Sequence, residues 1–347
     1  MRFAVRAAIA LVVLLVLAGG AYAAYWFAAA NTMRGAVAAW AAAPGDGTTV
    51  RIADIAISGF PTQLVTDIPR IEVQRSDALG LTYIGENVRV MRPLRGGDIV
   101  VSVRGPQTVS YRDGTETRTL RAKADLASLE LRSGDDGAFS GFNLILGNLT
   151  VERPDLAPLT ARRIQVQMGK GSGLGNFIPE RSRFTVRIEN MVMPEYRRGP
   201  LGDTIEQFAT NAALTKSIDS ANLPVSLAAW RDAGGYLTLV ETVLKWGSLD
   251  LQGQGSGVLK LDGQMRPAGG LNVQLRDYLL TVDAFHAARR LSDEARAAVQ
   301  QLVGFLSTRG AGGRVGLPLE IVNGEIIVGP AKLGTVSPIL PGPAAAP

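Results

Sequence analysis

The stretch Arg183-Phe-Thr-Val-Arg-Ile-Glu189 decides the fold class. Its apolar residues Phe184, Val186 and Ile188 alternate with charged or polar residues, which makes one face of an extended strand apolar and the other polar. Antiparallel sheets that face water on one side have this pattern, whereas buried parallel strands have continuous apolar runs. The same alternation recurs between residues 50 and 328. It predicts an α+β fold that is mainly β, with long curved antiparallel sheets.

Breaks in the alternation predict a few helices that pack on these sheets. Residues 201–219 have apolar side chains at roughly helical spacing, and residues 225–232 form a second candidate helix that ends at Gly234-Gly235. Two more helices are expected at 282–290 and from Ser292, a residue type favoured at helix N-termini, to about Gly310. Asn323-Gly324 between alternating segments predicts a β-hairpin.

An uncharged apolar segment precedes the strands. No charged side chain occurs between Arg6 and Arg34, and this segment exceeds the ~20 residues that a helix needs to cross a bilayer. Tyr22, Tyr25 and Trp26 follow at the position expected for an interfacial aromatic belt. A cleaved signal peptide is the alternative hypothesis, since Ala21-Tyr-Ala23 resembles a processing site. The predicted anchor residues are Ala10, Leu11, Val12, Val13, Leu14, Leu15, Val16 and Leu17.

The charges beside this segment predict its orientation and the location of the protein. Arg2 and Arg6 precede it, and only Arg34 follows closely, so the N-terminus is expected inside the cell. The predicted location is the bacterial inner membrane, with a single pass and the body in the periplasm. We expect an anchor and juxtamembrane helix at 1–43, an N-terminal β-sheet region at 44–195, a C-terminal β-sheet region with helices at 196–335, and a disordered tail at 336–347.

The composition argues against most chemical activities. The 347 residues include no cysteine and one histidine, His286, which argues against thiolate chemistry, a zinc site and a histidine-based triad. The formal charge of +5 is not concentrated in a basic cluster, so no nucleic-acid partner is expected. The glycine-rich segment 169–175 lacks phosphate-loop spacing and predicts a flexible connection. The glycine-rich segment 252–257 predicts a strand with a glycine bend. We therefore expect no enzyme activity, no cofactor and no metal.

Short motifs along the chain carry a family resemblance. They include Gly59-Phe-Pro61, the segment 230–235, the segment 246–253, and the segments 317–324 and 327–330. The motif residues are Gly59, Phe60, Pro61, Trp230, Gly234, Gly235, Trp246, Gly324, Gly329 and Pro330. Together they resemble a family of uncharacterised, membrane-anchored alphaproteobacterial proteins, domain of unknown function 2125. This family is similar to the AsmA-like group, whose members project β-sheet bodies from the inner membrane, and some of which are implicated in moving phospholipids.

The alternation and the resemblance lead to three functional hypotheses. A sheet whose apolar face is incompletely covered has a groove for acyl chains, and each buried CH₂ contributes about 0.8 kcal/mol. We expect an envelope protein that binds or conveys phospholipid or another amphiphile in such a groove. A closed sandwich would show the same alternation, and it would fit a structural or assembly partner that docks other envelope proteins through exposed strand edges. An anchored hydrolase would need catalytic residues that converge only in the fold.

Overall fold

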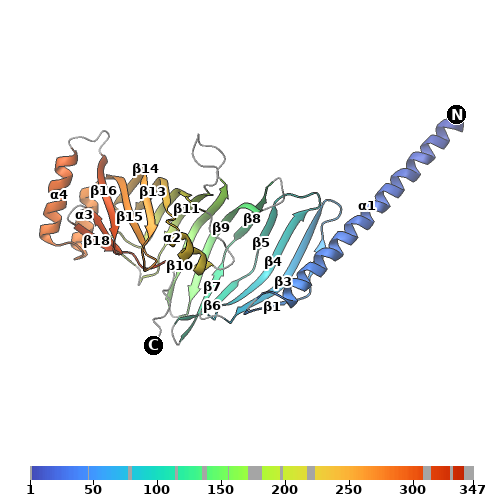
Figure 1. Ribbon diagram of the computed structural model, residues 1–347, viewed down its shortest axis with the longest axis horizontal. Helices are drawn as coiled ribbons and strands as arrows, with labels where there is room; N and C mark the ends of the chain where they lie inside the picture. Colours follow the sequence, from blue (N-terminus) through green and yellow to red (C-terminus); the bar gives the residue numbers. More distant parts are fainter. Residues whose placement is uncertain are drawn as a thin grey trace. The chain divides into compact units, whose positions relative to one another are not determined.

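The computed structural model shows a mainly β protein whose strands pair antiparallel (Figure 1). It describes residues 2–45, 47–76, 80–113, 116–134, 139–154, 156–170, 182–195, 198–216, 223–307, 314–328 and 331–339. These residues form two compact units. The first contains residues 1–139 and 151–154, and the second contains residues 140–150 and 155–347. The predicted mainly β, antiparallel fold class is confirmed.

The first unit begins with a long helix and continues as strands. Its elements are α1 (Arg2–Ala42), β1 (Thr48–Ile52), β2 (Ala56–Ser58), β3 (Gln63–Arg75), β4 (Thr82–Pro93), β5 (Ile99–Val103), β6 (Gln107–Asp113), β7 (Glu116–Lys123) and β8 (Leu126–Ser133). β9 (Phe139–Arg153) contributes residues to both units. β3 pairs with β1, β2 and β4. β4 pairs with β6 at its start and with β5 at its end, and Asn87 has a left-handed φ of 52° between these two pairings.

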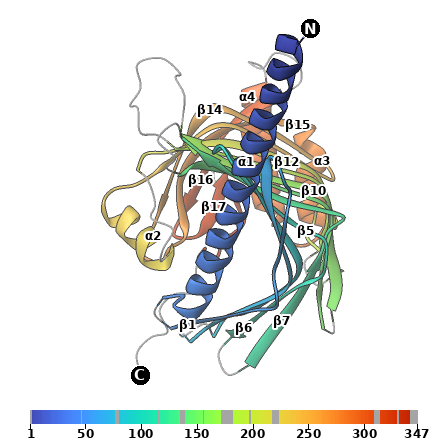
Figure 2. The same ribbon diagram turned by 90° about the vertical axis from the view of Figure 1, so that its right-hand side faces the viewer.

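Helix α1 packs its C-terminal half on the first unit. Trp26 and Ala30 are each 4% exposed and form a buried cluster with Leu64 of β3. Ile57 of β2 and Leu94, just after β4, pack against this cluster. In both views the C-terminal end of α1 lies beside β1 (Figure 1 and Figure 2). The predicted helix is therefore confirmed, and its far end is part of the core of this unit.

In its described residues, the second unit is a meander of antiparallel strands with three helices. Its elements are β10 (Leu156–Lys170), β11 (Ser182–Val192), β12 (Thr204–Leu214), α2 (Leu223–Asp232), β13 (Leu237–Trp246), β14 (Leu249–Leu261), β15 (Pro267–Arg276), α3 (Tyr278–Ala287), α4 (Asp293–Ser307), β16 (Arg314–Val322), β17 (Glu325–Val328) and β18 (Ala331–Thr335). Each strand from β10 to β18 pairs with the next one along the chain.

Helices α3 and α4 cover one end of the apolar face of this sheet. Val282 of α3 and Val299 of α4 pack on Val273 of β15 and on Val315 and Leu317 of β16, all 9% exposed or less. The Ser292 hydroxyl accepts a hydrogen bond from the Ala295 amide at 3.2 Å, which confirms the predicted helix start. Figure 1 shows both helices beside β16.

The helix predicted at 201–219 is wrong, because residues 204–214 form strand β12. Phe208 and Ala212 are four residues apart, a spacing that fits one face of a helix and, equally, alternate positions of a strand. β12 pairs along its length with β11 and with β13. The Thr210 and Thr242 hydroxyl oxygens lie 3.1 Å apart, and the Asn211 amide donates to the Glu241 carboxylate at 3.1 Å. The local sequence pattern fits a helix and a strand equally well. Pairing with strands on both sides therefore decides in favour of the strand.

Other local predictions are confirmed. The hairpin turn at Asn323-Gly324 has φ values of 53° and 77°, as its turn type requires. Helix α2 ends before Gly234, which has a φ of 77°. The glycine-rich segment 252–257 is a strand with an irregular register between Gly253 and Val258. Most of the segment 169–175 and of the predicted tail lies outside the described residues.

Within the part of the chain that the structure describes, no helix is both long and apolar enough to cross a membrane. The side chains of the predicted anchor residues Ala10 to Val16 are not among those described, and Leu17 is exposed. The predicted domain boundaries at 43, 195 and 335 stay predictions. Strands β11 and β12 lie on either side of residue 195 and are paired neighbours in the same unit.

Candidate functional site

The motif Gly59-Phe60-Pro61 lies against the aromatic residues of α1. The Trp26 indole donates to the Gln63 carbonyl oxygen at 3.0 Å, and the Tyr22 hydroxyl donates to the Pro61 carbonyl oxygen at 2.7 Å. The Trp26 and Phe60 rings meet edge to face with centroids 5.7 Å apart, and the Tyr22 and Phe60 centroids are 6.4 Å apart. We call this group, Tyr22, Trp26 and residues 59–61, the aromatic junction.

The turn of the aromatic junction requires glycine at its first position. Gly59 has a φ of 100°, and the Phe60–Pro61 peptide bond is cis. A Cβ atom at residue 59 would lie 2.7 Å from the Gln63 carbonyl oxygen and 2.9 Å from Cγ2 of Val65. Glycine is therefore needed here for two reasons. Its φ is unfavourable for other residues, and Gln63 and Val65 leave no room for a Cβ atom.

We expect Gly59→Ala to destabilise the first unit by about 1–3 kcal/mol, because a strained φ alone has a cost in this range and the added Cβ also collides. Gly96→Ala is the matched control, since Gly96 has a φ of 84° but open space around the Cβ position. Hydrogen exchange of the β2 and β3 amides measures the effect. Equal effects of the two variants would show that the close approach at Gly59 contributes nothing.

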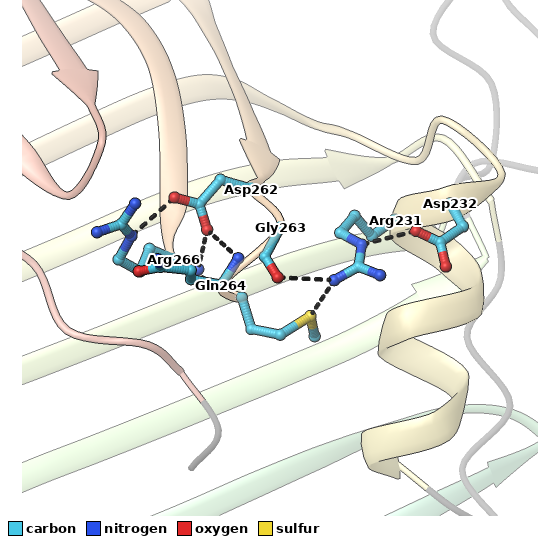
Figure 3. Close-up of polar contacts among 7 residues, drawn as sticks. Arg231, Asp232, Asp262, Gly263, Gln264 and Arg266 are labelled. Carbon is cyan, nitrogen blue, oxygen red and sulfur yellow. Dashed lines mark hydrogen bonds and ion pairs between the residues drawn. The ribbon is translucent and has the colours of Figure 1, made fainter. Parts of the chain in front are cut away.

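Two motif segments of the second unit border the turn between β14 and β15. The Trp230 ring packs on Gly235, where a Cβ atom would lie 2.4 Å from the ring. Its neighbour Arg231 reaches Sδ of Met265 at 3.3 Å and the carboxylate of Asp232 at 2.7 Å (Figure 3). A Cβ atom at Gly324 would lie 3.0 Å from the side chain of Arg266 in the same turn.

Asp262 organises this turn through charge-assisted hydrogen bonds. Its carboxylate accepts from the amides of Gln264 at 2.8 Å and Arg266 at 2.9 Å, and from Nε of Arg266 at 2.7 Å (Figure 3). Burial opposes ionisation of Asp262, but these hydrogen bonds outweigh it and hold its pKa below the ordinary value of 3.8. The hydrogen bond from Arg231 likewise lowers the pKa of Asp232. The motif at 230–235 thus borders a structural turn.

We expect Asp262→Asn to lower the stability of the second unit at pH 7 by on the order of 1–2 kcal/mol, since a hydrogen bond to a charged group contributes about 1.5–3 kcal/mol and asparagine keeps one acceptor oxygen. The folded-state pKa of Asp262 is lowered, so its contribution is present above pH 3.8 and is lost as the pH falls through the lowered pKa. Urea unfolding as a function of pH measures it. Glu320→Gln, which removes an exposed charge from the same unit, is the control. A pH-independent difference between wild type and Asp262→Asn would contradict the prediction.

The remaining predicted residues lie at separate places. The Trp246 indole donates to the Gly202 carbonyl oxygen at 3.2 Å. Gly329 and Pro330 lie outside the described residues. His286 is 2.8 Å from the Asp293 carboxylate and so links α3 to α4. Among the residues that were placed, no group of three or more His, Cys, Asp or Glu side chains could hold a metal ion.

An apolar hollow of about 170 Å³ lies on the sheet of the second unit, and it is open on one side. It is bordered by strands β12 to β16, beside the area that α3 and α4 cover. All its lining residues except Thr242 and Asn272 are apolar. They are Phe208, Leu239, Thr242, Leu244, Leu251, Gly253, Gly257, Leu271, Asn272, Val273 and Leu319.

The hollow continues into rows of apolar side chains that cross the sheet from β10 to β16. One row follows the strand pairings through Ile164, Ile188, Phe208, Leu244, Leu251, Leu275 and Val315. The last of these, Val315, is 3% exposed beneath the helices. Ile164, Ile188 and Phe208, at the other end of the row, are only half-buried. The cover of the apolar face therefore ends part of the way across the sheet.

Two glycines line the hollow, and Gly253 leaves space within it. Gly253 and Gly257 of β14 stand where the neighbouring strands carry larger residues. A Cβ atom at Gly257 would lie 2.1 Å from Leu271, whereas one at Gly253 would make only ordinary contacts at 3.6 Å or more. From its sequence alone, this segment predicts only a strand with a glycine bend. The pairing of β14 with both neighbours shows that these glycines face an apolar surface.

The fold and this surface define a class of protein: a mainly β body with an N-terminal helix and an incompletely covered apolar sheet face. The chain belongs to a family of bacterial proteins described as "Uncharacterized protein conserved in bacteria" (DUF2125), which matches residues 26–337. The matched range begins at Trp26 and so includes most of the aromatic junction. No curated protein and no solved structure matches the chain.

Proposed function

We propose that this protein is a membrane-anchored protein of the bacterial envelope that binds the acyl chain of a phospholipid or similar amphiphile on the apolar face of its second unit. The observation that carries the proposal is the apolar hollow, which lies in the open part of that face. The proposed activity is binding or conveying an amphiphile, without catalysis and without a cofactor.

The size and lining of the hollow support an acyl ligand. A closed apolar cavity of roughly 150 Å³ holds a molecule of the size of benzene, so a hollow of about 170 Å³ accommodates a short segment of an acyl chain. Because the hollow is open on one side and continues into half-buried rows, the remainder of the chain can lie along β10 to β12. Each CH₂ removed from water contributes about 0.8 kcal/mol.

The N-terminal segment supports the membrane location. Residues 7–33 carry no charged side chain, and α1 is 41 residues long, or about 60 Å at 1.5 Å per residue. About 20 residues cross the hydrocarbon core. The rest of α1 reaches the first unit and packs in its core. Single-pass anchoring in the inner membrane, with the body in the periplasm, is the arrangement that we propose.

Photo-crosslinking tests the binding proposal. The full chain is placed in lipid nanodiscs with a fatty acid that carries a photoactivatable diazirine on its acyl chain. We expect crosslinked peptides that contain Leu239, Leu251 or Leu271, all of which line the hollow. An excess of unlabelled phospholipid should compete. Crosslinks confined to α1 would show that the acyl chain meets only the anchor and would contradict binding in the second unit.

A further inference from the structure

The aromatic junction exposes large apolar side chains next to the segment that we propose as the anchor. Phe60 is 53% exposed although its ring contacts both Tyr22 and Trp26. On α1, Tyr25 is 57% and Phe27 61% exposed. Exposed aromatic rings close to one another are unusual in water, and aromatic side chains are enriched where a membrane meets water.

The helix places these rings within about 8 Å of one another along its axis, at 1.5 Å per residue. A span of about 20 residues that begins after Arg6 ends near residue 26, so Tyr22, Tyr25 and Phe27 lie near the boundary of the hydrocarbon core. Because Phe60 contacts Tyr22 at a centroid distance of 6.4 Å, the turn at 59–61 lies at the same level. The turn comes from the strand region, not from the helix, and it therefore brings the first unit to the membrane surface.

The charges around the junction fit the same partner. Leu94 packs against the Trp26 cluster, and its neighbours in sequence include Arg92 and Arg95, both exposed. The amide of Leu94 donates to the Thr62 carbonyl oxygen at 3.2 Å, so these arginines lie next to the turn. Basic side chains beside interfacial aromatic residues are attracted to anionic lipid headgroups.

We propose that the turn Gly59-Phe60-Pro61 is a second membrane contact, in which Phe60 inserts beside α1 at the interface of an anionic bilayer and holds the first unit against the membrane surface. This inference rests on the proposed anchor and is independent of amphiphile binding in the second unit. A structural turn does not require an exposed aromatic ring at residue 60, and neither does the anchor. Membrane contact accounts for the Phe60 ring, which would otherwise remain exposed to water.

Site-directed spin labelling tests the proposal in the full chain, which has no cysteine of its own. A nitroxide is attached to Phe60→Cys in vesicles of phosphatidylethanolamine and phosphatidylglycerol. Its collision rates with oxygen, which concentrates in the bilayer, and with a water-soluble nickel chelate are compared. Leu126→Cys is the matched control, because Leu126 is 52% exposed in the same unit. Leu14→Cys reports on the anchor.

We expect the ratio of oxygen to nickel accessibility at residue 60 to be several-fold higher than at residue 126. Thr62→Cys labels an exposed neighbour and leaves Phe60 in place. It should therefore show the same raised ratio of oxygen to nickel accessibility even where Phe60→Cys itself disturbs the junction. Ratios at residues 60 and 62 equal to the ratio at 126, with a bilayer signal at 14, would overturn this inference and leave the anchor intact. A water signal at 14 would overturn the anchor and this inference together.

Discussion

Gly253→Ile is expected to reduce the amphiphile bound to the purified protein at least tenfold. The substitution adds a side chain inside the hollow, where a Cβ atom meets neighbours at 3.6 Å or more and the backbone needs no left-handed φ. Displacing two methylenes of the ligand loses about 1.6 kcal/mol, and about 1.4 kcal/mol corresponds to a factor of ten in affinity. Quantitative lipid mass spectrometry of the wild type and the variant measures the change.

The fold should tolerate this substitution, since isoleucine is well suited to strands. Gly316→Ile is the matched control. Gly316 is exposed on β16 with open space around its Cβ position, on the face opposite the buried Val315 and Leu317. It should retain wild-type amounts of amphiphile. Unchanged amphiphile in a folded Gly253→Ile variant would show that the ligand binds elsewhere.

Trp26→Ala should destabilise the first unit by about 3–5 kcal/mol, the usual range for removing a buried tryptophan. The substitution removes the contact with Phe60, the hydrogen bond to the Gln63 carbonyl oxygen, and the packing on Leu64. Hydrogen exchange of the β2 and β3 amides in the full chain is the measurement, and these amides should exchange faster by the corresponding factor.

Trp40→Ala is the control for this variant. Trp40 lies on the same helix and is 47% exposed, so its replacement should change stability by no more than about 0.5 kcal/mol. Both variants replace tryptophan by alanine on α1 and so change intrinsic helix propensity in the same way. The difference between their effects on stability therefore measures the contribution of the contacts that Trp26 makes in the aromatic junction. Equal exchange in both would mean that α1 is not fixed to the strands through Trp26.

Period-two alternation predicted the fold class because it is a local property of each strand. The same local evidence failed at residues 204–214. Phe208 and Ala212 satisfy both a helix and a strand, and only the pairing of Thr210 with Thr242 and of Phe208 with Leu244 decides between them. Asn87 shows a related limit. Its left-handed φ marks the point where β4 changes partners, which cannot be read from residue 87 alone.

The candidate sites were predictable only in part. Tyr22, Trp26 and the motif at 59–61 were each notable in the sequence, but the hydrogen bond from Trp26 to Gln63 joins residues 37 positions apart. Nothing local indicates that contact. The hollow was less visible still, because it depends on which residues of β12 to β16 share a face. Gly253 and Gly257 suggested a bend, but their neighbours across the sheet show that Gly253 leaves space and that Leu271 fills the space beside Gly257.

The measurement that tests the central claim most directly is a census of the molecules that accompany the purified full chain. The protein is extracted with a styrene–maleic acid copolymer and transferred to detergent-free buffer with amphipol, and native mass spectrometry then records the bound mass. We predict one phospholipid or other diacyl amphiphile per chain, which is lost in Gly253→Ile and retained in Gly316→Ile. A chain free of amphiphile, or one accompanied by other envelope proteins in place of lipid, would contradict the account and favour an assembly partner.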